Sequence, residues 1–166
     1  MFGFGKKKAP PPTKIAAAYS FSDAFVLHSQ GRAPSWIHIA CEPYIRLSRG
    51  ASSDDLGRAV RSILNAYRPE VTEPADFKQV TADFLRGMGV KSNRRLQETS
   101  ISCGLRQKED GFEFAPARNG GTSGDGKGFQ PIAGAAFLIP IDASDAELGA
   151  GLLRGFDLCT SIFSTT

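Results

Sequence analysis

Two segments of the sequence, 92 positions apart, repeat the same strand-to-helix junction, and this repeat constrains the fold more than any other feature. Ala51-Ser52 and Leu56-Gly57 in the first segment match Ala143-Ser144 and Leu148-Gly149 in the second. In each segment an extended apolar run reaches a serine suited to cap a helix, and an acidic residue follows three positions later, as in a capping box. The chain therefore contains two equivalent helix starts, with coincidence between two ordinary junctions as the alternative.

The glycine in each repeat predicts a close contact. Glycine costs about 1 kcal/mol relative to alanine inside a helix, so Gly57 and Gly149 would be unfavourable there without a steric reason. We expect each helix to approach the sheet closely at its glycine. The repeat concerns the fold and carries no chemistry.

Hydrophobic periodicity and turn residues predict the remaining elements. Strands are expected at 19–30, 36–39, 44–47, 99–106, 112–116 and 136–141, and helices at 52–67, 73–86 and 144–158, with a short helical turn at 91–96. The expected apolar stripes are Leu56, Val60, Ile63, Leu64 and Tyr67 in the first helix and Phe77, Val80, Phe84 and Leu85 in the second. Trp36, Tyr19, Tyr44 and most of the twelve phenylalanines are assigned to the core. These elements predict a single α+β domain, with an antiparallel or mixed sheet of five to six strands and about three packed helices.

Residues 1–14 are expected to form a disordered basic, proline-rich arm, which leaves 15–166 as the domain. Lys6, Lys7, Lys8 and Lys14 carry four of the 20 basic groups, so the domain has 16 basic against 17 acidic side chains. A nucleic-acid-binding domain is usually strongly basic. The arm could contact RNA or anionic lipid, but a solubilising tail is the favoured interpretation. Without a membrane-spanning apolar run or a signal-peptide pattern, we expect a cytoplasmic protein.

No pattern in the sequence indicates a catalytic or metal site. The three cysteines are odd in number and lack Cys-x-x-Cys spacing, which favours reduced thiols over a disulfide framework, with a reactive thiol as the alternative. His28, His38 and Cys41 would form a zinc site or a Cys–His pair only if folding happened to bring them together. We therefore expect no catalytic residue, no metal and no cofactor.

A glycine-rich segment comes close to a nucleotide-binding motif. Residues 121–127 match Gly-x-x-x-x-Gly-Lys, but Gly128 stands where a P-loop needs serine or threonine. Phe129-Gln130-Pro131 cannot open the helix whose N-terminus would receive a phosphate. We expect a surface loop over 117–131.

Two polar sets remain as candidate contact surfaces for a protein partner. The first is acidic, lies on or before the second helix, and consists of Glu70, Glu73, Asp76 and Asp83. The second lies on the glycine-rich loop and consists of Arg118, Asn119, Asp125 and Lys127. The acidic set suits a cationic partner, with a solvated face as the alternative, whereas ordering a glycine-rich loop on binding costs entropy. The acidic set is therefore favoured.

Five parts of the sequence together carry a family resemblance. They are residues 20–25 (SFSDAF), 45–47 followed by 52–57 (IRL and SSDDLG), 89–92 (GVKS), 116–121 with 128–131 (PARNGG and GFQP), and 141–149 (IDASDAELG). In their order and spacing they resemble the immunity proteins of bacterial contact-dependent growth inhibition (CDI) systems. The resemblance covers about residues 19–160.

The resemblance implies a cytoplasmic protein that binds and blocks the C-terminal toxin domain, often a nuclease, of its cognate inhibition protein. It implies a one-to-one protein complex, no shared catalytic residues, no small-molecule substrate, and no direct contact with nucleic acid or a membrane. The alternative function is a basic-armed adaptor that docks on nucleic acid or a membrane surface, and an enzyme of another type is the third.

Overall fold

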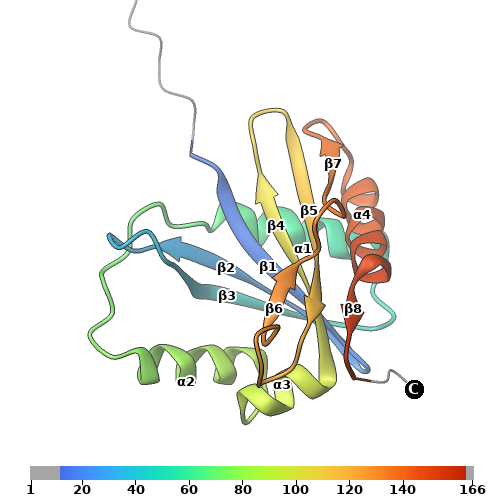
Figure 1. Ribbon diagram of the computed structural model, residues 1–166. Coiled ribbons are helices and arrows are strands. Elements are labelled where there is room, and N and C mark those ends of the chain that lie inside the picture. Colours follow the sequence, from blue (N-terminus) through green and yellow to red (C-terminus); the bar gives the residue numbers. More distant parts are fainter. Residues whose placement is uncertain (1–11, 164–166) are drawn as a thin grey trace, which may run out of the picture.

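The computed structural model describes residues 12–163, which form eight strands and four helices (Figure 1). The strands are β1 (Lys14–Phe21), β2 (Ala24–Arg32), β3 (His38–Ser48), β4 (Ser100–Gln107), β5 (Gly111–Asn119), β6 (Phe129–Pro131), β7 (Phe137–Pro140) and β8 (Thr160–Ser161). The helices are α1 (Ser53–Asn65), α2 (Phe77–Met88), α3 (Asn93–Thr99) and α4 (Asp145–Leu158). The predicted α+β class is confirmed, with three longer helices and the short α3.

One sheet organises the domain. Its order is β3-β2-β1-β4-β5-β6, and the two short strands β7 and β8 also pair with β5. Neighbouring strands are antiparallel except for β8, which runs parallel to β5. The central pair β1–β4 is in continuous register from Lys14↔Gln107 to Phe21↔Ser100. The predicted β4–β5 hairpin is confirmed.

The prediction of one strand over 19–30 is wrong, because this segment contains the turn of a hairpin. β1 and β2 pair antiparallel around Ser22 and Asp23, with Ser20 opposite Phe25. Lys14, which was predicted to lie in the arm, is the first residue of β1 and donates a hydrogen bond from Nζ to Asn65 Oδ1. Pro12 and Thr13 of the predicted arm are irregular and exposed, and residues 1–11 lie outside the described residues.

Residues 38–39 and 44–47, predicted to lie in two strands, belong to the single strand β3, whereas 36 and 37 precede it. β3 is an edge strand, where Pro43, which has no backbone N–H, is tolerated. The second helix begins later than predicted: α2 starts at Phe77, and Asp76 is its N-cap, accepting a hydrogen bond from the Lys78 N–H. Phe77 is 55% exposed and does not belong to the core stripe.

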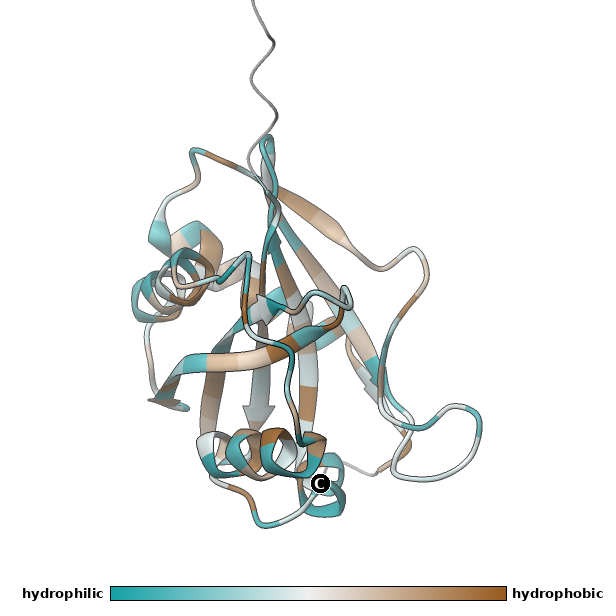
Figure 2. Cartoon of the chain, turned by 90° about the vertical axis from the view of Figure 1, so that its left-hand side faces the viewer, coloured by the Kyte–Doolittle hydropathy of each residue, from teal (hydrophilic) through white to brown (hydrophobic). Residues whose placement is uncertain are grey.

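Helices cover both faces of the sheet. α1 and α4 lie on one face, where Leu56, Ile63, Leu148 and Leu152 are fully buried. α2 and α3 lie on the other face, where Met88 and Leu96 join β1 and β2 in a smaller cluster. Figure 2 shows brown and teal segments mixed along the helices, as expected for helices that turn an apolar side to the sheet and a polar side to solvent. Each fully buried leucine contributes about 1.5–3 kcal/mol, so the α1–α4 face holds most of the apolar burial.

The repeated glycines mark a contact between the two helices. A Cβ added to Gly57 would lie 1.8 Å from the Asp145 carbonyl oxygen, and one added to Gly149 would lie 1.8 Å from the Ser53 carbonyl oxygen. The prediction that each glycine brings its helix close to the sheet is therefore wrong. Each glycine instead admits the N-terminal backbone of the other helix, and the repeat reflects a reciprocal α1–α4 crossing.

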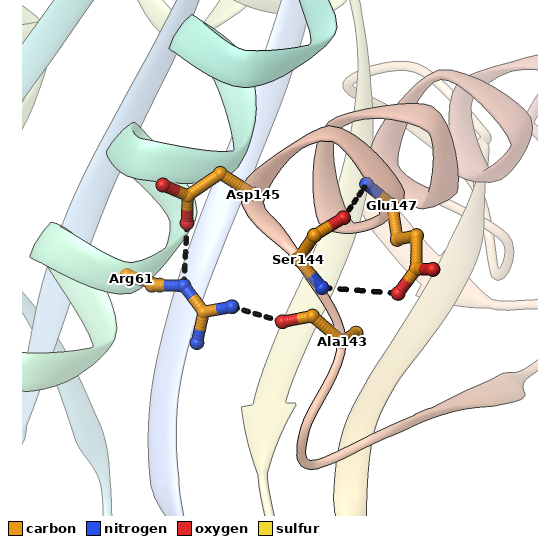
Figure 3. Close-up of polar contacts among 5 residues, drawn as sticks. All are labelled: Arg61, Ala143, Ser144, Asp145 and Glu147. Carbon is orange, nitrogen blue, oxygen red and sulfur yellow. Dashed lines mark hydrogen bonds and ion pairs between the residues drawn. The ribbon is translucent and has the colours of Figure 1, made fainter.

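Hydrogen bonds and an ion pair also stabilise the start of α4 and its contact with α1 (Figure 3). Ser144 accepts a hydrogen bond from the Glu147 N–H, and the Glu147 carboxylate accepts one from the Ser144 N–H, which completes the predicted capping box of α4. Arg61 of α1 pairs with Asp145 at 2.5 Å and donates to the Ala143 carbonyl. In α1, Ser52 accepts from the Asp55 N–H, as predicted.

Candidate protein-binding surface

The described residues contain no group of three or more histidine, cysteine or acidic side chains placed to hold a metal ion. His28 is buried among the rings of Tyr19, Tyr44 and Phe84, and its Nδ1–H donates to the Ser29 carbonyl. Burial lowers the pKa of His28, so the ring is neutral at pH 7. This histidine packs as a core residue.

The cysteines are free thiols with depressed reactivity. Burial raises the pKa of Cys41 and Cys159, and that of Cys103 to about 12. A thiol with a raised pKa holds little thiolate at neutral pH, and the thiolate is the reactive form. The predicted reduced thiols are confirmed for all three positions.

The glycine-rich segment forms a loop, as predicted, but only over residues 120–128, because 117–119 end β5 and 129–131 form β6. The Gly128 N–H donates to the Gly121 carbonyl at 2.7 Å, and the Gly120 N–H donates to the Gly128 carbonyl. The chain then enters β6, a strand, where a P-loop would be followed by a helix. Among the described residues, no helix has the length and apolar character to cross a membrane.

The structure places the second candidate set partly inside the protein. Arg118, Asp125 and Lys127 are exposed. Asn119 has 0% exposure, and its amide donates to the carbonyls of Gln97 and Ser100 while its Oδ1 accepts from the Gly121 N–H. The expectation that Asn119 lies on a surface is therefore wrong, because the side chain fastens the loop to the end of α3.

The four acidic candidates lie on the segment before α2 and on α2 itself, and they differ in what holds them. Asp76 caps α2, and Asp83 accepts hydrogen bonds from Gln79 and Arg86. Glu73 accepts two hydrogen bonds from Ser35, one from its backbone N–H at 3.1 Å and one from its hydroxyl at 2.7 Å. Glu70 is exposed and forms no hydrogen bond or ion pair within the described part of the chain. Glu70 and Glu73 therefore flank the β2–β3 connection, and Asp76 and Asp83 belong to α2.

The two candidate sets flank the same face of the sheet. Phe84 of α2 and Phe129 of β6 both contact the ring of Tyr19, with ring centroids 6.2 and 5.4 Å away. α2, which carries Asp83, and β6, which follows the glycine-rich loop, therefore both contact Tyr19 of β1. No contact joins the acidic side chains to those of the loop within residues 12–163.

The sequence did not reveal the most exposed large apolar residue beside Glu70 and Glu73. Trp36 was assigned to a strand and to the core, but it lies in the β2–β3 turn and is 73% exposed. Its neighbour Ile37 is 38% exposed. We call residues 33–37 the hairpin tip. The signal that could have revealed it is Pro34 two positions earlier, since proline at the second position of a β-turn places Trp36 at the fourth.

Trp36 has an unusual backbone conformation. Its φ is +68°, and it is the one non-glycine residue with positive φ among residues 12–163. A bulky residue in this region is strained by about 1–2 kcal/mol. In hairpins that combine a β-turn with a left-handed residue, glycine is the usual choice at that place. The Arg32 guanidinium covers the indole, 4.4 Å from the ring centroid.

The hairpin tip is firmly supported. The Trp36 N–H donates to the Ala33 carbonyl and the Ala33 N–H to the Ile37 carbonyl. Residues 68–71 run beside the end of β2, bonded through the Arg32 N–H to the Arg68 carbonyl and the Val71 N–H to the Arg32 carbonyl. A surface hollow of about 490 Å³ beside Trp36 is lined by this segment, with Arg32 and Glu70 as its charged residues. The hairpin tip is therefore held in place by backbone hydrogen bonds and carries the exposed indole ring of Trp36.

Comparison with known proteins identifies the family and shows which solved structures share the fold. Residues 42–159 match the family CdiI, described as CDI immunity protein. A protein of unknown function from Neisseria meningitidis is similar in structure, with a TM-score of 0.70, 16% identity, and coverage of 92% of this chain and 99% of that one. No curated protein sequence matches the chain.

A second solved structure is a CdiA-CT/CdiI toxin and immunity complex from Yersinia pseudotuberculosis. Its matching chain has a TM-score of 0.69 and 17% identity, with coverage of 92% of this chain and 100% of that one. At such identities the two structures establish the fold alone. The family match spans well over half of the sequence, and the chain therefore belongs to the CdiI family of CDI immunity proteins.

Proposed function

We propose that this protein binds the C-terminal toxin domain of its cognate CDI protein in the cytoplasm and neutralises it as a one-to-one complex. The observation that carries the proposal is the family match over residues 42–159. The likeness to a chain from a toxin and immunity complex supports it, because the fold is shared over 92% of this chain. A tight complex is required, since a small free fraction of an active toxin would still act on the cell.

The proposal is tested by titrating the cognate toxin domain with the purified protein. Toxin activity should fall linearly and end near one molar equivalent, with a Kd in the nanomolar range or below, equivalent to about 12 kcal/mol. An immunity protein from a different CDI system is the matched control, because it shares the fold and not the partner. Inactivation by far less than one equivalent would contradict the proposal and indicate a catalyst.

We further propose that the toxin is a nuclease. The exposed Glu70 and Glu73 beside the hairpin tip support a cationic partner, and clefts that bind nucleic acid are cationic. The purified toxin domain should cleave RNA or DNA, and the protein should stop that cleavage. A toxin that blocks growth without cleaving nucleic acid would contradict the nuclease assignment while leaving the immunity function in place.

A further inference from the structure

The hairpin tip presents a large aromatic side chain that the fold itself does not use. Trp36 is 73% exposed, more than any other large apolar residue among residues 12–163. A residue whose backbone strain serves no packing of its own chain is a candidate for function. Tryptophan is also among the residue types that contribute most to binding at protein interfaces.

The tip is organised before any partner arrives. Ser35 is bonded to Glu73 through both its N–H and its hydroxyl, and residues 68–71 are bonded along the end of β2. Gly31 allows this approach, because a Cβ there would lie 2.4 Å from the Val71 side chain. Little freedom is lost on binding when the contact residue is already fixed, so a rigid tip favours affinity.

We propose that Trp36 is an anchor of the toxin interface and inserts into an apolar socket on the toxin domain. This inference rests on the proposed function and assigns its contact surface. Arg32 stacks on the indole and keeps it in place, while Glu70 at the rim meets cationic groups of the toxin. The surface joins one aromatic anchor to the acidic residues Glu70 and Glu73.

The charges around the hairpin tip favour a protein partner over a nucleic acid. Two carboxylates, Glu70 and Glu73, lie beside Trp36, whereas the one guanidinium that lines its hollow, Arg32, is engaged with the ring. Phosphate groups would be repelled by the carboxylates, so a nucleic-acid strand stacked on Trp36 is disfavoured. A protein with basic groups around an apolar hollow is complementary to this surface.

The first experiment compares Trp36→Asn with Leu138→Ala in binding to an inactivated cognate toxin domain. Asparagine adopts positive φ readily, so Trp36→Asn should fold with an unchanged or higher melting temperature. Its Kd for the toxin should rise about 30-fold or more, as for an interface hot spot. Leu138, 52% exposed on β7 at the other side of the sheet, is the matched control and should change the Kd less than about 2-fold.

The second experiment uses the fact that Trp36 is the single tryptophan of the chain. Incorporation of 5-fluorotryptophan gives one ¹⁹F resonance, which should shift and lose its exposure to solvent when unlabelled toxin is added. Light scattering of the free protein tests whether a second copy of the chain covers Trp36. Titration with single-stranded RNA tests whether a nucleic acid does so.

The outcomes separate the inference from the proposed function. If the wild-type protein does not bind the toxin, both are wrong. If it binds and Trp36→Asn binds within 2-fold of it, or the ¹⁹F signal stays solvent-exposed in the complex, the anchor is wrong and the immunity function stands. Self-association or RNA binding through Trp36, without a loss of toxin affinity in the variant, would also overturn the anchor.

Discussion

Gly57 and Gly149 occupy reciprocal positions, since each lies against the N-terminal backbone of the helix that carries the other. At these positions an alanine Cβ would lie 1.8 Å from a backbone carbonyl oxygen, of Asp145 or of Ser53. Backbone atoms cannot rotate away as a side chain can, so the helices would have to separate.

Gly57→Ala and Gly149→Ala are each expected to destabilise the protein by about 3 kcal/mol or more. Helix propensity alone predicts the opposite sign, because alanine is favoured over glycine by about 1 kcal/mol. Chemical denaturation measures the change. Gly50→Ala is the control, as the nearest heavy atom to its added Cβ is 3.9 Å away; equal effects at all three positions would contradict the packing explanation.

Arg61→Lys should weaken the α1–α4 contact by about 1 kcal/mol. Lysine cannot reach the Asp145 carboxylate and the Ala143 carbonyl together, and the pair is about one-third exposed, so solvent screens part of the charge interaction. Arg58→Lys, in the more exposed pair with Asp55, is the control and should change the free energy of unfolding very little. Similar losses for the two variants would show that the Ala143 bond contributes nothing.

Asn119→Ala should lower the free energy of unfolding by about 3 kcal/mol, because two carbonyls and the Gly121 N–H lose their partner in a buried site. Thermal unfolding checks this. Arg118→Ala, one residue earlier and exposed, should leave the melting temperature nearly unchanged. A loss of stability at residue 118 as large as at 119 would contradict the role of the amide.

The stability of the protein should fall as the pH drops below about 6.5. Burial holds the pKa of folded His28 below its ordinary value of 6.5, so the unfolded state binds more protons in this range. Protonation therefore favours unfolding, and the effect vanishes above pH 6.5. His28→Phe should reduce the drop in melting temperature between pH 7 and pH 5, whereas His38→Gln, at a far more exposed histidine, should reduce it less. Low-pKa carboxylates such as Glu113 act in a lower pH window.

Glu70→Lys should slow association with the toxin roughly threefold to tenfold at low salt and leave the melting temperature unchanged. Glu70 has no bonded partner among the described residues, whereas Glu73 is bonded to Ser35 and Asp76 caps α2, so reversing those charges would also disturb the fold. Stopped-flow kinetics at two salt concentrations measures the effect. Asp110→Lys, in the β4–β5 turn, is the control; equal slowing by both variants would indicate a net-charge effect only.

Elements set by local signals could be predicted from the sequence. The caps Ser52 and Ser144 with their leucine stripes define α1 and α4, and the Asp-Gly turn defines the β4–β5 hairpin. The resemblance to CDI immunity proteins, which was based on five short segments of the sequence, is confirmed by the family match. Membership in this family agrees with the prediction of a binding protein that is not an enzyme.

What the sequence did not reveal depends on contacts between distant segments. The partner of Gly57 is a helix that begins 88 positions later, at Asp145, and nothing near Gly57 identifies it. Phe77 and Trp36 are as apolar as core residues, and only the placement of α2 and of the hairpin tip leaves them exposed. The burial of Asn119 likewise follows from the approach of α3 to β5.

The α1–α4 crossing also sets when the protein can become protective during its synthesis. Gly57 and Gly149 are 92 residues apart, and at 5–20 residues per second the ribosome needs roughly 5–20 s to add that length. Until α4 has left the exit tunnel, the face of the sheet under Leu148 and Leu152 has no cover and α1 has no partner. A chain that still lacks α4 cannot form this contact, and we expect it to become able to bind a toxin only after α4 has been made.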